Sequence, residues 1–210
     1  EKDAAIVKQL AREMESWYST LAAPLALGTR SAAVLTIEFA YRTPSRSSAP
    51  YPPWIMKDGV LVASSPHQGP LAPDETPSLA LRQRTAGYVV EALLARQTGL
   101  QSKNRTSPIT KAVWNELRDW VLIRLADAAF DGNAWVFPAT PLLAALVQRY
   151  SEASIPPLLD ALGEMEEASS LEAILAPANL PPLAAVDSVA FFLTAAARAS
   201  SNADDVLYNA

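Results

Sequence analysis

The chain has 210 residues, 50% of them hydrophobic, which is enough for an ordinary buried core in one large domain or two small ones. Its formal net charge is -5 and its Lys and Arg residues are scattered, which excludes a nucleic-acid footprint and a polybasic membrane patch. The lack of cysteine excludes disulfides, thiolate metal ligands and a cysteine nucleophile.

The first segments predict a helix followed by a strand. Residues 3–21 place apolar side chains at three- and four-residue steps, with most charged residues on the other face, which is typical of an amphipathic helix. Pro24 and Gly28 end this pattern. Residues 31–43 then concentrate β-branched and aromatic residues before Pro44, which indicates a strand.

Residues 54–66 predict a β-hairpin. Two short apolar runs flank an Asp-Gly pair at positions 58 and 59, and this pair is a strong hairpin-turn signal. Loops rich in proline and small polar residues lie on both sides of the hairpin, at 43–53 and 67–77.

The stretch LALRQRTAGYVVEALLARQTG, residues 79–99, predicts an amphipathic helix with Thr76 as its N-cap and Pro77 at its first position. Nearly all of the remaining chain predicts helices, the third of them stopped by Gly163. These further helices are expected at 109–129, 141–152, 156–162, 170–175 and 183–199. The last one is Ala-rich and is interrupted by Asp187, which suits a buried helix and not a membrane span.

This order of elements predicts an α+β fold, with a small N-terminal sheet and flanking helices followed by a larger all-helical half. We place the α+β part at 1–106 and the helical part at 107–210, within one continuous domain. The chain opens at Glu1 with neither Met nor a charged-then-apolar leader, so we interpret it as trimmed and infer no compartment from its start.

Four short motifs follow one another along the chain. Pro53-Trp54 precedes the hairpin, the helix at 79–99 follows, WVLIRLAD stands at 120–127, and YSE at 150–152 is followed by LLDALG at 158–163. Their order resembles the peptidase MA-like, or gluzincin, domains of bacterial extracytoplasmic proteins. The resemblance implies a zincin-like fold and an extracytoplasmic location, either secreted or anchored through a segment outside this chain.

In those domains the helix matching 79–99 carries His-Glu-x-x-His, and the next helix supplies a zinc-binding glutamate. Here Gln83 and Gly87 stand at the two histidines of that motif, Arg84 stands at its glutamate, and Ile123 stands at the third ligand position. These residues cannot supply the three ligands of a catalytic zinc, and an always-charged arginine cannot act as its general base. The resemblance therefore implies a degenerate former metal site that holds no metal or other cofactor.

A Ser-His-Asp set can also be written around His67, the only histidine, which lies between serines at 64–65 and acids at 74–75. No Gly-x-Ser-x-Gly turn accompanies it, so a solvated loop histidine is the favoured interpretation.

An acidic run and one acid within a predicted strand are further candidate sites. The acidic run of Glu164, Glu166 and Glu167 is more typical of a solvated helix junction than of a cation site. Glu38, within the predicted strand, can point to solvent simply by alternation.

An aromatic, proline-rich ledge is predicted beside an edge strand. Tyr51 and Trp54 form the ledge, and Val60 and Val62 lie in the hairpin next to it. In active relatives such a strand receives an extended substrate by main-chain pairing, so the resemblance implies that a silent relative can bind an extended peptide or protein there. The alternative is that Trp54 is a core plug that covers the sheet.

The function predicted from the sequence is a non-catalytic, degenerate peptidase-like domain that serves as a binding or structural module of an extracytoplasmic protein. The alternative is a metal-free hydrolase with an unrecognised site. The packing of 79–99 against 109–129 tests the first interpretation, which requires antiparallel helices with Gln83, Gly87 and Ile123 converging beneath the hairpin.

Overall fold

The structure is a computed structural model that describes residues 3–27, 36–40, 55–57, 60–65, 76–99, 107–130, 138–165 and 168–200. It is predominantly helical, as the sequence predicts for most of the chain. The helices are α1 (Ala4–Ala22), α2 (Leu79–Thr98), α3 (Pro108–Ala129), α4 (Pro141–Tyr150), α5 (Ile155–Glu164), α6 (Leu171–Leu175) and α7 (Ala185–Ser200), with a 3-10 turn at Glu152–Ser154. Over the described residues, no helix is both long and apolar enough to cross a membrane.

The described strands are β1 (Thr36–Ala40), β2 (Ile55–Lys57) and β3 (Val60–Ser64), and they form one small sheet in the order β1-β3-β2. β2 pairs antiparallel with β3 where the sequence predicts a hairpin, and β1 pairs parallel with β3. The Asp-Gly turn at 58–59 lies outside the described residues. The sheet is thus a minor element beside a much larger set of helices.

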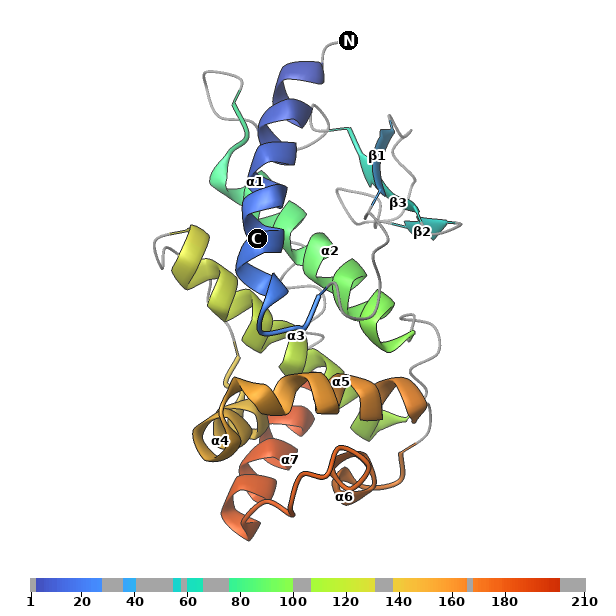
Figure 1. Cartoon of the computed structure of the whole chain (residues 1–210), viewed down its shortest axis with the longest axis vertical. Helices are drawn as coiled ribbons and strands as arrows, with labels where there is room; N and C mark the ends of the chain where they lie inside the picture. Colours follow the sequence, from blue (N-terminus) through green and yellow to red (C-terminus); the bar gives the residue numbers. More distant parts are fainter. Residues whose placement is uncertain are drawn as a thin grey trace.

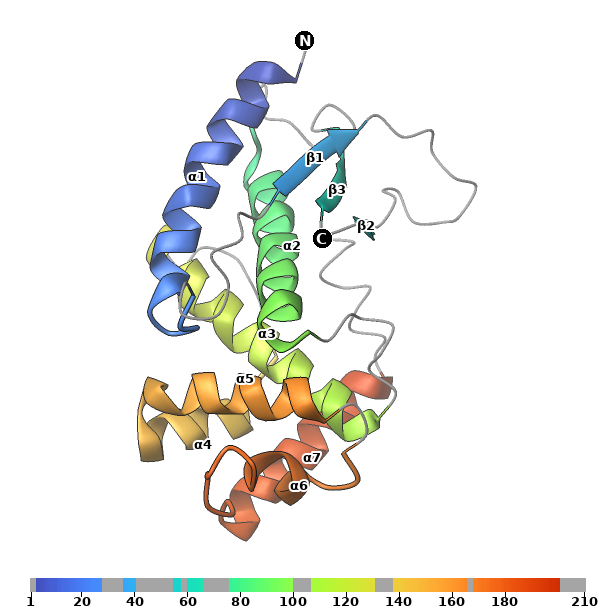
Figure 2. The same cartoon turned by 45° about the vertical axis from the view of Figure 1, so that its right-hand side comes forward.

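The helices form two groups joined by α3. In both views, α1, α2 and the sheet lie at one end of the molecule, α4 to α7 gather at the other, and α3 runs between them (Figures 1 and 2). The sheet is tied to the start of α1, because the Ser65 hydroxyl donates a hydrogen bond of 2.5 Å to Asp3 Oδ2.

One hydrophobic core crosses the boundary expected at 106/107. α3 is its centre, with Trp114 and Val121 fully buried. Trp17 of α1 and Phe191 of α7 belong to the same cluster, and the Trp17 ring lies 5.6 Å from that of Phe130 between centroids. Burial of such large side chains is the main stabilising contribution that this helical packing provides.

Serine side chains begin three of the helices. Ser78, Ser107 and Ser170 are the N-caps of α2, α3 and α6, and each hydroxyl accepts a hydrogen bond from the backbone N–H three residues further on. The expectation that Thr76 caps the second helix and Pro77 starts it is therefore wrong by two residues. Ser78 has the extended backbone that an N-cap needs, and its hydroxyl reaches the first turn.

Gly163 does not stop α5, which continues to Glu164. A Cβ atom at this position would lie 2.6 Å from the backbone oxygen of Thr98, in the last turn of α2. The glycine is needed because it lets α5 and α2 come close together, and not because a helix ends there.

Gly163→Ala is therefore expected to destabilise the protein by about 2 kcal/mol, because one of the two backbones must shift. Gly87→Ala is the matched control, since a Cβ at that helical glycine meets nothing within 4 Å. Its expected effect is a gain of about 0.5 kcal/mol from helix propensity. Urea unfolding measures both changes, and a gain in stability at both positions would contradict the close approach.

Candidate functional site

Three of the positions at which the resemblance implies a former metal site lie on α2, and the fourth, Ile123, lies on α3. Gln83 and Gly87 are one turn apart and share a face with Glu91, one further turn along the helix. Gln83, Arg84 and Gly87 are all half-buried, and the space that a Cβ would enter at Gly87 is open. This face of α2 is therefore accessible near its middle.

Two contacts show that α2 and α3 run antiparallel. Near the start of α2, the guanidinium carbon of Arg82 lies 5.0 Å from the ring centroid of Phe130, which follows the end of α3. Later in α2, Glu91 Oε1 lies 3.4 Å from Arg118 Nη1, in the middle of α3. Figure 2 shows the same opposite directions, with the two helices crossing obliquely.

These contacts place two of the candidate positions at about the same level. Gly87 lies about midway between the two contacts on α2, and the half-buried Ile123 lies about midway between them on α3. The sheet lies beside the N-terminal parts of α1 and α2 (Figures 1 and 2). The antiparallel packing that the former-site interpretation requires is therefore present in the helix pair.

The residues at these positions have no zinc-binding or base chemistry. Gly87 has no side chain, Ile123 is apolar, and Arg84 carries a permanent positive charge that opposes a dication. Within the described part of the chain, no three His, Cys, Asp or Glu side chains gather as a metal site requires.

Tyr88 follows the degenerate motif and is buried. Burial raises the pKa of Tyr88 to about 12, and the nearby Arg84 acts in the opposite direction. The phenol therefore stays protonated at ordinary pH and can act only as a neutral buried polar group there.

The expected peptide-binding edge is wrong for two of its residues. Val60 and Val62 lie on β3, which is the middle strand and is paired on both sides, by β1 and by β2. Sequence places the hairpin strands together but does not show that β1 joins the side of β3 that β2 leaves open. Within the described sheet, β1 and β2 are the edges. Tyr51 and Trp54 lie outside the described residues.

The other candidate sites are only partly described. His67, the acids at 74–75 and two acids of the 164–167 run, Glu166 and Glu167, lie outside the described residues. Glu164 and Glu38 are exposed, as a solvated junction and strand alternation predict. The serine at 65 is buried and its hydroxyl bonds to Asp3, an acid that the Ser-His-Asp hypothesis does not include.

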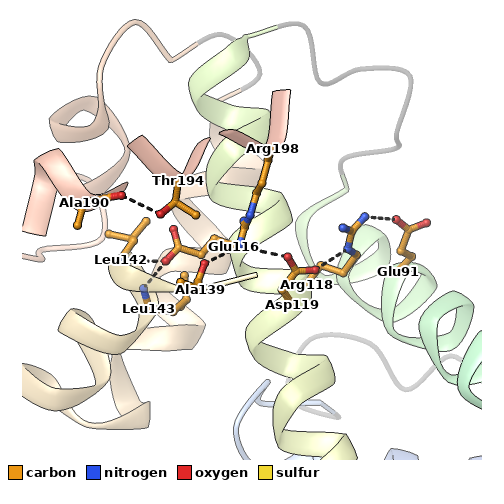
Figure 3. Close-up of polar contacts among 10 residues, drawn as sticks. All are labelled: Glu91, Glu116, Arg118, Asp119, Ala139, Leu142, Leu143, Ala190, Thr194 and Arg198. Atoms are coloured by element: carbon orange, nitrogen blue, oxygen red, sulfur yellow. Dashed lines mark hydrogen bonds and ion pairs between the residues drawn. The ribbon is translucent and has the colours of Figure 1, made fainter. Parts of the chain in front are cut away.

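Sequence reasoning missed a chain of buried charges centred on α3. Arg118 Nε lies 3.2 Å from Asp119 Oδ1, and Arg118 Nη1 lies 3.4 Å from Glu91 Oε1 on α2. On the other side, Arg198 Nη2 of α7 lies 3.3 Å from Asp119 Oδ2 and donates a 2.6 Å hydrogen bond to the Ala139 carbonyl. Figure 3 shows these groups in one line that links α2, α3 and α7.

Glu116, one turn before Asp119, caps a different helix. Its Oε1 accepts hydrogen bonds from the backbone N–H groups of Leu142 at 2.5 Å and Leu143 at 3.2 Å, in the first turn of α4 (Figure 3). The N-cap residue itself, Thr140, makes no side-chain hydrogen bond there. A carboxylate from α3 thus satisfies backbone donors that every helix start leaves unpaired.

Burial raises the pKa of Glu116 to about 7, against the opposing effect of the two backbone hydrogen bonds and of Arg198. Buried carboxylates with raised pKa values are common among catalytic acids. Here, however, both N–H contacts of Glu116 belong to α4, and the neighbouring charges pair with one another. We interpret Glu116 and the neighbouring ion pairs as structural contacts that hold α2, α4 and α7 against α3.

A scan against models of known protein families matched none of them, and the searches of curated proteins and of solved structures found no match either.

Proposed function

We propose that the chain is a non-catalytic, degenerate peptidase MA-like domain that serves as a binding or structural module of an extracytoplasmic protein. The observation that supports the proposal best is the antiparallel pairing of α2 and α3, which sets Gly87 and Ile123 at about the same level near a small sheet. At these positions an active relative would carry two zinc ligands. This chain offers neither, and Arg84 replaces the base.

The proposed ligand is an extended peptide or protein segment that adds a strand to the small sheet. Main-chain groups of an edge strand supply hydrogen bonds for such an addition, and neighbouring side chains select the sequence. β2, which follows Trp54 in the chain, and β1, the longer edge, are the strands that this mode would use.

Restoring the zinc ligands of an active relative tests whether positions 83, 87 and 123 lie close enough together to bind one metal ion. The variant combines Gln83→His, Arg84→Glu, Gly87→His and Ile123→Glu, so that two histidines one turn apart meet a carboxylate from the antiparallel helix. Three such ligands and one water complete a tetrahedral zinc site. We expect about one equivalent of tightly bound zinc in the variant and less than about a tenth in the wild type, measured by mass spectrometry after incubation with excess zinc.

The matched control keeps Ile123 and carries Arg124→Glu in its place, because position 124 is exposed and points about 100° away around α3. It should bind clearly less zinc than the restored variant. Equal zinc uptake by two folded variants would show that positions 83, 87 and 123 do not converge, and would overturn the resemblance. Near-stoichiometric zinc in the wild type, or peptide hydrolysis by it, would overturn the non-catalytic assignment.

A further inference from the structure

α7 turns Arg198 inward and most of its large apolar side chains outward. Arg198 faces α3 and pairs with Asp119, while Phe191 is buried in the core. The other face is open, although the composition of this helix predicts burial. Its exposed large side chains are Val186 at 79%, Val189 at 56%, Phe192 at 45% and Leu193 at 67%.

These side chains form one continuous stripe. Val186, Val189 and Leu193 follow at three- and four-residue steps, and the exposed alanines at 185, 196 and 197 extend the same face to both ends of the helix. We call these six residues with Phe192 the α7 stripe. It contains no charged or polar side chain, because Asp187 and Arg198 lie on the other side of the helix.

The surface that packs against this stripe should also be uncharged, because a charge buried against apolar side chains would have no partner. A helix that binds membrane surfaces usually adds Lys and Arg beside its apolar face, and α7 offers only Arg198, which is turned inward. A partner that binds through charged side chains would find no charged group on the stripe to pair with. Two copies of the stripe, however, can face each other without like charges in contact, although each chain carries -5 overall.

The residue sizes along the stripe also suit a twofold pair. If two α7 helices run antiparallel with the axis at position 191, Val189 meets Leu193 of the second copy and Val186 meets its Ala196. Large residues then lie opposite small ones toward the ends, which lets the side chains interdigitate.

We propose that the α7 stripe is a self-association surface, through which two copies of the chain form an antiparallel α7 pair. The four large side chains expose roughly 400 Å² per copy, about half of what each partner contributes to a standard-size interface, and the exposed alanines add to this area. The pair is therefore weak, with a dissociation constant of about 10 µM to 1 mM. This inference does not depend on the proposed binding function, since it uses the opposite end of the molecule.

Sedimentation equilibrium of the full chain from about 5 µM to about 1 mM, a range set by that dissociation constant, tests the proposal. The wild type should pass from monomer to dimer. Val186→Glu and Leu193→Glu should each weaken the dimer by about tenfold or more, because each would bury a charged carboxylate against apolar side chains of the second copy. Both positions are exposed in the monomer, and an acid at 186 lies in the first turn of α7, where the helix dipole favours it.

Ala128→Glu, at an exposed position on α3, is the control with the same change of charge. It should leave the dissociation constant unchanged. A wild type that stays monomeric over the whole range, whether or not vesicles or another protein bind it, overturns the proposal. So does a Val186→Glu or Leu193→Glu variant that has a wild-type circular dichroism spectrum and dimerises as well as the wild type.

Discussion

Asp119→Ala is expected to lower the free energy of unfolding by about 3 to 5 kcal/mol, the range found when one partner of a buried ion pair is removed. The Asp119 carboxylate is buried and lies within 3.3 Å of two guanidinium groups, those of Arg118 and Arg198. Without it, both cations stay largely buried and lose their attraction to Asp119, although Arg118 keeps its contact with Glu91 and Arg198 its hydrogen bond to the Ala139 carbonyl. Urea unfolding followed by tryptophan fluorescence measures the difference.

Asp127→Ala is the control, because Asp127 lies on the same helix and is exposed. Its expected effect is within about 0.5 kcal/mol, since exposed surface substitutions rarely cost more. Adding Arg198→Met to Asp119→Ala should recover part of the loss, because it removes one of the two buried cations that Asp119 neutralises in the wild type. A loss below about 1 kcal/mol in Asp119→Ala would mean that the buried chain of ion pairs contributes little to stability.

Helix positions were predictable because their signals are local. The pattern in residues 3–21 predicts α1, found at Ala4–Ala22, and the pattern in 109–129 predicts α3, found at Pro108–Ala129. Apolar periodicity and N-terminal proline act within a few residues of one another, so sequence alone carries them. The helix-rich character of the chain follows from the same signals.

The order of the strands was not predictable in the same way. β2 and β3 are neighbours in sequence, and their pairing follows from a short turn. β1 reaches β3 only through a long connection, and no local pattern says which side of β3 it joins. Val60 and Val62 therefore looked like edge residues, although they lie on the middle strand.

The buried charges on α3 had a signal that went unused. Glu116, Arg118 and Asp119 occupy three of four consecutive positions between Trp114 and Trp120. Successive helical residues are about 100° apart, so these three charges cannot share one solvated face, and the flanking tryptophans indicate burial on several sides. Buried ion pairs were therefore predictable in kind. Their partner Arg198 was not, because only the fold brings α7 to this point.

Protein stability is expected to fall as pH rises from about 5 to about 7.5. Burial raises the pKa of Glu116 from 4.5 to about 7, with Asp119 acting in the same direction and Arg198 against it. Between these values the folded chain holds a proton that the unfolded chain has released, so a rise in pH favours unfolding. The difference corresponds to roughly 3 kcal/mol, most of it lost by pH 7.5. Urea titrations at half-unit steps of pH measure this slope.

Glu116→Gln identifies the source of that slope. Glutamine keeps an oxygen that can accept the N–H groups of Leu142 and Leu143 but does not ionise, so its stability should be nearly flat across this range and should exceed that of the wild type at pH 8. Asp127→Asn, with the same change of charge at an exposed site, should keep the wild-type slope. If Glu116→Gln keeps it too, the titrating group lies elsewhere, and the carboxylate that caps α4 is not the source of the pH dependence.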